Sequence, residues 1–343
     1  MPRKGMTISE NLPKIAIYGL GAITITMAHA LHQTKTPFTI LCRNEKRKSD
    51  LTNDPIRFQL RSNKIEILPL SLRAKTLSEA KDPFDYIVIG TKSQNLSEAI
   101  ASASPFLRPN GKLILIQNGF PETNAGISAK QMIGGVVGWN TQKLNNGIYF
   151  QSNIGSLILG GVDGEKPPLF FKTIFGSWIP VILTENLPGY RWHKLGINCV
   201  INGLSASCML SLGKLMHNGY GRTAGIKILS EIRQAMEKSG VKEEVVPGSI
   251  SIRKLGDGLG AFPMWLRHLI LIGLGFKYYK IRTSMVQDLD QGRMTEIDDL
   301  NGLAVKIAKS LLLDAKVNEA VCLRVKDLEQ KKIKPEISFL KTL

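Results

Sequence analysis

The sequence predicts an α/β fold with a mostly parallel sheet over residues 1–186, followed by an all-α domain over residues 187–343. Three observations predict this division. Apolar strands alternate with helical stretches in the first part of the chain, a glycine-rich turn follows the first strand, and helical patterns continue beyond Pro188. The length of 343 residues, of which 43% are hydrophobic, suits about two domains that each bury a core.

The beginning of the sheet has the clearest pattern. Residues 14–18 form an apolar strand, a helical pattern follows, and residues 38–42 form a second strand. This order within about 30 residues is a βαβ unit. Two more strongly apolar strands, at 86–89 and 113–116, indicate a parallel sheet that helices cover on both faces.

From about residue 135 to 186 the pattern changes. Short segments at 147–150 and 156–159, separated by Asn-Gly and Gly-Gly turns, predict hairpin-like strands. Residues 1–13 are expected to form a loose tail. Beyond Pro188 the chain predicts helices over 190–207, 222–239, 262–281, 285–310 and 315–331.

The charge balance limits the classes of partner. Lysine and arginine number 45 against 28 acids, and the formal net charge of +17 attracts anions such as phosphorylated cofactors, carboxylates, nucleic acid or acidic membranes. The alternative is a basic surface that is merely solvated. No basic segment carries interleaved aromatic residues, and no apolar run approaches the ~18–20 residues of a membrane span. We therefore expect neither a nucleic-acid nor a membrane partner.

The cysteines and histidines predict no metal site and no disulfide framework. The four cysteines are scattered without a C-x-x-C pair, and the five histidines lack the spacing of metal ligands. The basic N-terminus has no apolar stretch behind it that would mark a secretory signal. A reducing, cytoplasmic location is therefore expected.

The turn after the first strand carries a glycine pattern. Its six residues occupy the positions of G-x-G-x-x-G, with a threonine in the third glycine position. The first glycine permits a tight turn, and the second lets a pyrophosphate approach the N-terminus of the following helix. The pattern predicts a Rossmann-like domain that binds a dinucleotide, whereas the alternative is an ordinary turn between a strand and a helix. The predicted cofactor-binding residues here are Gly19, Leu20, Gly21, Ala22, Ile23 and Thr24.

The end of the second strand indicates which dinucleotide is bound. NAD-binding domains usually place an acid there to accept a hydrogen bond from the ribose 2′-hydroxyl. Here the strand ends at Arg43, with Lys46 and Arg47 just beyond, and no carboxylate stands at the strand end itself. These cations suit a 2′-phosphate, so we predict NADP(H) with Arg43 as a ligand. The alternative is that Arg43 is an ordinary surface residue.

Several longer motifs follow in order along the chain. They are Asp85–Lys92 (DYIVIGTK), Ile116–Gly119 (IQNG), Arg191–Asn202 (RWHKLGINCVIN), Thr283–Asp288 (TSMVQD) and Gly292–Asp298 (GRMTEID). Together with the glycine turn, these motifs resemble the ketopantoate reductase (2-dehydropantoate 2-reductase) family over residues 14–325. Leu212 stands where some members carry a substrate-binding asparagine, and residues 245–281 form a longer segment than in compact members.

The resemblance implies a Rossmann domain and a helical domain with the site between them. It implies that NADPH reduces the ketone of 2-dehydropantoate to give (R)-pantoate, in the biosynthesis of pantothenate and coenzyme A, with Lys194 as the proton donor and Glu296 beside it among the catalytic residues. The other positions that match are Asn198, Asn202, Ser284 and Asn118 for the substrate, and Lys92, Asn118 and Glu296 for the cofactor cleft.

The residue types suit this chemistry. Hydride delivery to a ketone builds negative charge on its oxygen, and a cation there stabilises the charge and supplies the proton. Lys194, Asn198 and Asn202 follow at spacings of four, so a helix places them on one slowly drifting face. The alternative is a solvated lysine followed by asparagines that cap nearby loops.

The other candidates also carry two interpretations. Glu296 either orients Lys194 or is an acid in the first turn of a helix. Asn118 either binds a ligand at the carboxyl edge of the sheet or is a turn residue, and Lys92 either meets an anion or is a surface lysine. Ser284 and Gln287 form an S-x-x-Q capping box, which is compatible with substrate binding.

Other functions remain open at the level of sequence. One is the reduction of a different small 2-keto acid. Another is a non-catalytic NADP-binding sensor, which would not need Lys194 and Glu296 to face the cofactor. The expected partner is a small 2-keto acid, and a homodimer is compatible with the sequence.

Overall fold

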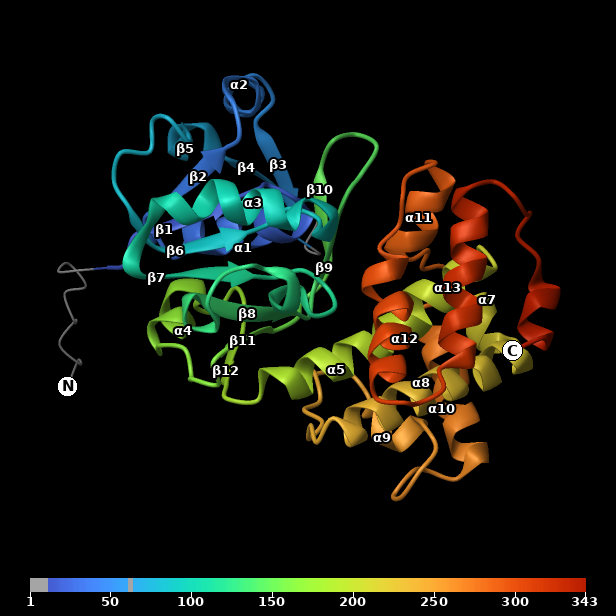
Figure 1. The fold of residues 1–343 in the computed structure, drawn as a ribbon. Helices are drawn as coiled ribbons and strands as arrows, with labels where there is room; N and C mark the ends of the chain where they lie inside the picture. Colours follow the sequence, from blue (N-terminus) through green and yellow to red (C-terminus); the bar gives the residue numbers. More distant parts are fainter. Residues whose placement is uncertain (1–11, 61–63) are drawn as a thin grey trace, which may run out of the picture. The chain divides into compact units, whose positions relative to one another are not determined.

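The computed structural model describes residues 12–60 and 64–343, which divide into two compact units (Figure 1). The first unit runs through Gln117 and continues over Pro121–Leu187. The second comprises Asn118–Phe120 and Pro188–Leu343. Most of the tail expected over residues 1–13 lies outside the described residues.

The first unit contains the predicted parallel sheet. In the described residues its eight strands lie in the order β12-β11-β8-β7-β6-β1-β2-β5. Neighbouring strands are parallel except for β8 and β11. The stretch β5-β2-β1-β6-β7-β8 has the strand order of a Rossmann domain, which confirms the predicted fold class. The strands are β1 (Ile15–Tyr18), β2 (Phe38–Cys42), β5 (Ala74–Thr76), β6 (Phe84–Ile89), β7 (Leu107–Leu115), β8 (Met132–Val137), β11 (Leu157–Gly161) and β12 (Val181–Thr184).

Helices cover both faces of this sheet, as its apolar strands require. Ile17 of β1 is fully buried between Ile40 of β2 and Val88 of β6. Side chains of α1 (Ala22–Gln33) and α4 (Phe170–Phe175) belong to one apolar cluster. Side chains of α3 (Leu96–Ala103) belong to another. β1 and β6 are neighbours at the point where the strand order reverses. Their carboxyl ends therefore mark the edge at which sheets of this kind bind ligands.

A smaller sheet corrects the hairpin prediction. Its strands lie in the order β4-β3-β10-β9, and the Leu144 N–H donates to Ile148 O across the turn between β9 and β10. The predicted segments 147–150 and 156–159 are both extended, but β10 lies in this sheet and β11 in the larger one. The strands are β3 (Ile56–Gln59), β4 (Ile65–Leu68), β9 (Asn140–Lys143) and β10 (Tyr149–Asn153), and α2 (Glu45–Asn53) precedes β3.

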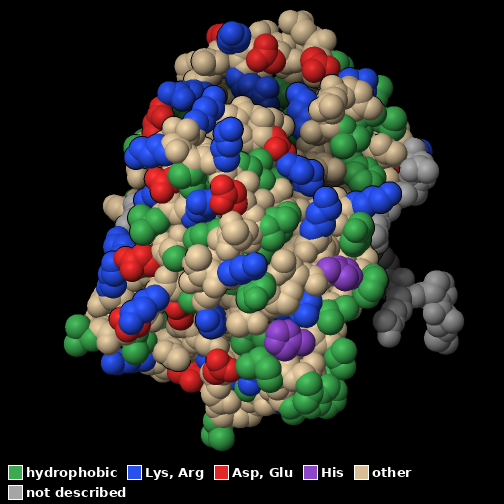
Figure 2. Space-filling model, turned by 90° about the vertical axis from the view of Figure 1, so that its right-hand side faces the viewer, with side chains coloured by type: hydrophobic (Ala, Val, Ile, Leu, Met, Phe, Trp, Pro, Cys, Tyr) green, Lys and Arg blue, Asp and Glu red, His purple; other side chains and the backbone are tan. Residues whose placement is uncertain are grey.

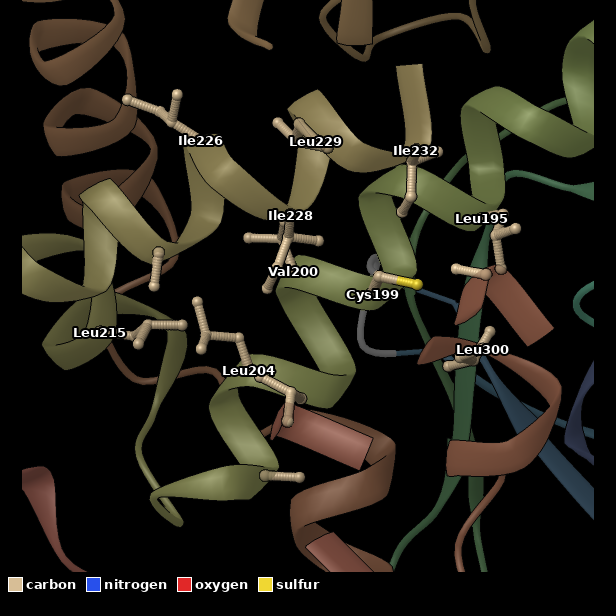
Figure 3. Close-up of a cluster of buried hydrophobic side chains, with 14 of the residues drawn as sticks. Leu195, Cys199, Val200, Leu204, Leu215, Ile226, Ile228, Leu229, Ile232 and Leu300 are labelled. Atoms are coloured by element: carbon tan, nitrogen blue, oxygen red, sulfur yellow. The ribbon is translucent and has the colours of Figure 1, made fainter. Parts of the chain in front are cut away.

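The described residues of the second unit form helices. Their core joins α8 to the long helix that begins with α5, through side chains such as Leu195, Val200, Ile228 and Leu229 (Figure 3). The helices are α5 (Leu187–Asn198), α6 (Ser205–Ser207), α7 (Leu212–His217), α8 (Gly219–Lys238), α9 (Ile252–Leu255), α10 (Met264–Lys277), α11 (Ser284–Asp290), α12 (Asn301–Ser310) and α13 (Lys316–Glu329). None of them, over the residues described, combines the length and apolar character that a membrane crossing requires.

Two predicted helices differ from the structure. The single helix over 285–310 is wrong, because α11 ends at Asp290 and Gly292 takes a left-handed φ of 64°. The helix over 190–207 forms, but its middle, Cys199–Leu204, is a π-helix. The Asn301 side chain approaches this segment, where its Nδ2 donates to Cys199 O over 3.4 Å. A β-carbon on Gly203 would lie 1.9 Å from Asn301 Oδ1, so the absence of a side chain at Gly203 leaves room for Asn301 beside this wide turn.

Candidate functional site

The first unit has a cavity of about 120 Å³ at the carboxyl ends of β1 and β2. In doubly wound sheets ligands bind at this edge, beside the reversal of strand order. The cavity is thus in the place where the glycine pattern predicts a dinucleotide. Its lining includes Gly19, Leu20, Arg43, Arg47, Thr91 and Glu98.

The glycine turn is held by the residue that replaces the third glycine. Gly19 has a φ of 91°, and Gly21 is the N-cap of α1. The Thr24 hydroxyl accepts a hydrogen bond from the Gly21 N–H over 2.9 Å and lies 2.8 Å from Gly19 O, to which it donates. The side chain thereby connects both ends of the turn. Ala22 and Ile23 form the first helical positions, where backbone N–H groups point away from the helix and favour anions.

The close approach that the third glycine usually provides is supplied by Gly90, which follows β6. A β-carbon on Gly90 would lie 2.3 Å from Gly19 O and 2.4 Å from Thr24 Cγ2. The threonine fits because its neighbour on the next strand has no side chain. The departure from the glycine pattern is therefore compatible with a cofactor turn.

The cations at the end of β2 have an acidic neighbour that the sequence did not reveal. Arg43 Nη2 lies 2.5 Å from Glu98 Oε1 of α3, and both residues line the cavity. Arg47 Nη2 reaches the glycine turn, where it donates to Leu20 O over 3.4 Å. Lys46 is exposed and does not line the cavity. The cavity thus offers two guanidinium groups to an anion, with one of them paired to a carboxylate.

Lys92 lies on the same unit, three residues after the end of β6. It is exposed and precedes the 3-10 turn Ser93–Asn95. Gln117, near the end of β7, donates to the carbonyls of Ile89 and Thr91 over 2.8 and 3.0 Å, and so fixes the chain that leads to Lys92.

In the second unit, three of the predicted site residues are joined by two consecutive side-chain hydrogen bonds. Asn198 Nδ2 donates to Asn118 Oδ1 over 3.1 Å, and Asn118 Nδ2 donates to Glu296 Oε2 over 3.1 Å. Asn198 is buried, whereas Asn118 and Glu296 are partly buried. The network fixes the orientation of both amides, and it requires Glu296 to be an acceptor.

Lys194 lies one helical turn before Asn198 on α5. Desolvation by the surrounding protein lowers the pKa of its ammonium group below the ordinary value of 10.5. Within the residues that the structure describes, this ammonium makes neither an ion pair nor a hydrogen bond. A desolvated and unpaired cation is costly, and such groups concentrate at functional sites.

The local structure of Asn202 and of Ser284 differs from the regular helix and the capping box that the sequence predicts. Asn202 lies in the π-helix, which widens the turn between it and Asn198, so the regular α-helical spacing does not hold there. The capping box at Ser284 is wrong, because Thr283 is the N-cap of α11 and Gln287 donates to Arg282 O instead. Ser284 is the exposed first residue of this helix, and the buried Thr283 hydroxyl has no partner in the described residues.

A buried network beside Lys194 was missed from the sequence. His193 is fully buried, with Nδ1 2.7 Å from Glu243 Oε1 and Nε2 2.9 Å from Ser249 Oγ. Glu243 also accepts from the Ser251 hydroxyl and from the Ile252 N–H at the start of α9. Burial acts to raise the pKa of Glu243, but the hydrogen bonds from His193, Ser251 and Ile252 together hold it below 4.5. The loop over 241–251 is thereby tied to the helix that carries Lys194.

Metal chemistry has no obvious ligands here. Over the residues described, no group of three or more His, Cys, Asp or Glu side chains could hold a metal ion. Cys42, Cys199, Cys208 and Cys322 are each buried and free.

The chain is similar in sequence to known protein families and to individual relatives. Residues 15–164 match the family model "Ketopantoate reductase PanE/ApbA", and residues 186–329 match "Ketopantoate reductase PanE/ApbA C terminal". An uncharacterized oxidoreductase, YkpB, of Bacillus subtilis is 22% identical over 93% of this chain and 100% of its own length. A 2-dehydropantoate 2-reductase of Pyrococcus horikoshii is 24% identical over 89% of this chain and 94% of its own.

Solved structures share the fold. A PanE/ApbA family ketopantoate reductase from Ralstonia eutropha has a TM-score of 0.74 at 21% identity and covers 93% of this chain and 99% of its own. A D-mandelate dehydrogenase, solved with NADH and anilino(oxo)acetate, also has a TM-score of 0.74, at 17% identity over 93% of this chain and 99% of its own. The two family models together span most of the chain, and the chain therefore belongs to the ketopantoate reductase PanE/ApbA family, a family of oxidoreductases.

Proposed function

We propose that this protein uses NADPH to reduce a small 2-keto acid, with 2-dehydropantoate as the substrate and (R)-pantoate as the product, in pantothenate and coenzyme A biosynthesis in the cytoplasm. The observation that carries the proposal is the desolvated, unpaired ammonium of Lys194, one turn from the chain of hydrogen bonds formed by Asn198, Asn118 and Glu296. The family match and the relatives named as 2-dehydropantoate 2-reductases support it.

The residues of the cavity in the first unit fit a dinucleotide with a 2′-phosphate. Gly19 and Gly21 keep the turn free of side chains, and Ala22 and Ile23 offer helix N-terminal amides to a pyrophosphate. Arg43 and Arg47 supply two planar cations that suit a phosphate, with Thr24 holding the turn and Leu20 lining the cavity. When bound, NADPH supplies the hydride.

The Arg43–Glu98 pair does not oppose this assignment. Both side chains are more than half exposed, and exposed pairs contribute little to stability. A phosphate dianion binds a guanidinium more strongly than a single carboxylate does, so it displaces Glu98 from Arg43. Lys92 offers a further cation for the cofactor or the carboxylate of the substrate.

Lys194 acts as both electrostatic stabiliser and proton donor in this proposal. Its ammonium stabilises the negative charge that develops on the ketone oxygen and then transfers a proton to it. Desolvation has two favourable consequences. It strengthens the attraction to an oxyanion, and it lowers the pKa toward the operating pH, which suits an acid.

In this proposal the other polar residues that match the family motifs position the substrate. The amides of Asn198, Asn118 and Asn202 and the hydroxyl of Ser284 supply donors for a carboxylate and acceptors for a hydroxyl. Glu296 holds the Asn118 amide and can accept from a hydroxyl of the substrate or the ribose. These assignments rest on the family motifs in which the residues occur.

A second candidate is the reduction of a different, more apolar 2-keto acid. Leu212, which stands where some members carry an asparagine, is 5% exposed and packs in the core of the second unit. It therefore supplies no amide for a distal hydroxyl of the substrate. The structural likeness to a D-mandelate dehydrogenase is compatible with this alternative.

The decisive experiment is an assay of NADPH oxidation, followed optically, with 2-dehydropantoate against a panel of other 2-oxo acids. We expect the highest kcat/KM for 2-dehydropantoate, and a kcat for Lys194→Ala lower by about 10²–10⁴-fold with NADPH affinity retained. Lys238→Ala, at an exposed helical lysine, is the matched control. Normal turnover by Lys194→Ala would remove this residue from the mechanism, and a preference for an apolar 2-oxo acid would establish the second candidate.

A further inference from the structure

Helix α10 presents an apolar face to solvent. Within this helix Arg267, Leu271 and Gly275 are buried, at a spacing of four, and they form a narrow stripe. Gly275 fits against α7, since a β-carbon there would lie 2.9 Å from Met216 Cβ. The helix is attached to its unit along this stripe and through Ile270 and Leu274, which pack against the core. Four of its large apolar side chains are instead exposed: Met264, Trp265, Leu269 and Phe276.

The exposed face is large and aromatic. Trp265, Leu269 and Phe276 are 64%, 55% and 69% exposed, and they follow at the spacing of one helix face. Leu259 before the helix is 92% exposed, and Tyr279 after it is 50% exposed. We call these five residues the α10 face. Clustered exposed apolar side chains of this size mark an interaction surface rather than ordinary surface variation.

The charges on α10 and its flanks are predominantly positive. Residues 259–282 contain no Asp or Glu. Arg267 pairs with Asp257 and Arg282 with Asp290, whereas Lys277 and Lys280 are exposed. Figure 2 shows hydrophobic side chains gathered toward the lower end of the face in view, with Lys and Arg and some Asp and Glu side chains near them. An occupant of this face must therefore be apolar and anionic at once.

A second copy of the chain fits this requirement poorly. Pairing through the α10 face would bring Lys277 and Lys280 of two chains together, with no acid on residues 259–282 to match them. The net charge of +17 on each chain adds to this repulsion. Charge complementarity thus favours a negatively charged surface over self-association.

We propose that the α10 face docks on the surface of an anionic lipid bilayer. Tryptophan, tyrosine and phenylalanine are the side chains that settle at the level of the headgroups, and neighbouring lysines are attracted to anionic lipids. Stable attachment needs two such signals, and α10 with its flanks carries both. The helix lies in the plane of the interface and does not cross it. The lack of a membrane-crossing segment predicts no membrane partner, but attachment in the plane of the interface does not require such a segment.

The test is flotation of the purified full-length protein with vesicles of phosphatidylcholine that contain phosphatidylglycerol, and with vesicles of phosphatidylcholine alone. We expect binding to the anionic vesicles that is about tenfold stronger and is weakened by salt. Because Trp265→Ser with Phe276→Ser leaves the net charge unchanged, a loss of about tenfold in binding by this variant assigns the contact to the α10 face rather than to general basicity.

Leu312→Ser, at a leucine that is 91% exposed elsewhere in the second unit, is the matched control and should bind like the wild type. Circular dichroism and the midpoint of thermal unfolding verify that each variant is folded. Equal binding to both kinds of vesicle, or full binding by the double variant, overturns the proposal. So does a wild-type dimer in light scattering that the double variant converts to a monomer without any vesicle binding. None of these readouts uses reductase activity, so they are independent of the proposed function.

Discussion

The side-chain amide of Asn118 donates to the carboxylate of Glu296 over 3.1 Å, although 178 residues separate the two in sequence. The same amide accepts from Asn198, so each end of Asn118 is committed to a partner. The family motifs that contain these three residues are thus joined in one network.

Asn118→Ala should lower kcat/KM for the keto acid by about 10–100-fold. The change removes the amide that hydrogen-bonds to both Asn198 and Glu296, and a lost hydrogen bond of this kind costs about 1–3 kcal/mol. Steady-state kinetics at saturating NADPH measures the effect. Asn145→Ala, at an exposed asparagine of the first unit that does not line the cofactor cavity, serves as the control. Unchanged kcat/KM in Asn118→Ala would show that the network does not position the substrate.

The activity should have an alkaline limit set by Lys194. Its folded-state pKa lies below 10.5, and the protonated form is the proposed acid, so kcat should fall as the pH rises through that lowered pKa. The stability changes in the opposite sense. Between the folded and unfolded pKa values the unfolded chain binds more protons, so the contribution of this group to stability rises with pH.

Lys194→Met tests both statements about this ammonium. It should abolish the alkaline limb of kcat while leaving the free energy of unfolding at neutral pH equal or higher, because a costly desolvated charge is removed. pH–rate profiles and denaturant unfolding of the wild type and the variant provide the measurements. A marked loss of stability in Lys194→Met would indicate that the ammonium has a structural role.

Glu98→Gln should increase the preference for NADPH over NADH. The substitution frees Arg43 from its ion pair and removes a negative charge from the cavity, while the side-chain volume is preserved. We expect the KM for NADPH to fall by about two- to fivefold, since exposed pairs are worth up to about 1 kcal/mol, with little change for NADH. Arg43→Ala should shift the ratio of the two KM values in the other direction. A fall in both KM values together would contradict a role in recognising the 2′-phosphate.

Gly90→Ala should destabilise the first unit and weaken NADPH binding. The new β-carbon would lie 2.3 Å from Gly19 O and 2.4 Å from Thr24 Cγ2, so the cofactor turn must shift. Overpacking of this kind costs about 1–3 kcal/mol. Thermal unfolding and NADPH titration measure the two effects. Gly273→Ala has open space around its β-carbon and is the control, with stability equal to the wild type or higher. Restoration of NADPH binding by Thr24→Gly in the Gly90→Ala background would identify the threonine methyl as the main obstacle.

The buried pair of His193 and Glu243 should make the second unit sensitive to acid. The folded-state pKa of Glu243 is held below 4.5, so its stabilising contribution is present above that value and is lost as the pH falls through the lowered pKa. Glu243→Gln should lower the free energy of unfolding at pH 7 and flatten its decline in acid. Denaturant unfolding between about pH 3 and pH 7 checks this prediction. An acid decline as steep as that of the wild type would assign it to other carboxylates.

The parallel sheet and the glycine turn could be predicted because their signals are local. The strand from Ile15 to Tyr18 is apolar throughout, and its glycine turn stands directly before a helix. β9 could not be predicted in this way, because Asn-Thr-Gln-Lys is polar and its pairing partner β10 decides its conformation. The π-helix at Cys199–Leu204 likewise depends on Asn301, which is about a hundred residues away and leaves no periodic signal.

The site shows the same difference between local and distant signals. The motifs located Asn118, Lys194 and Glu296, but the contact between Arg43 and Glu98 depends on how α3 packs against the end of β2. The burial of His193 against Glu243 depends on a loop of irregular structure. Neither contact follows from spacing along the chain, because each joins residues from separate elements.

Because Asn118–Phe120 group with residues 188–343, the helical part is assembled from two stretches of polypeptide. The Phe120 ring packs edge-on against Trp192 at 5.5 Å, and Gly119 approaches the backbone of Asp299 too closely for any side chain. A fragment cut at residue 187 would lose this aromatic contact and a member of its polar network. During synthesis on the ribosome, the tripeptide emerges before these neighbours, since Trp192 and Asn198 belong to the middle third of the chain and Glu296 and Asp299 to its last third.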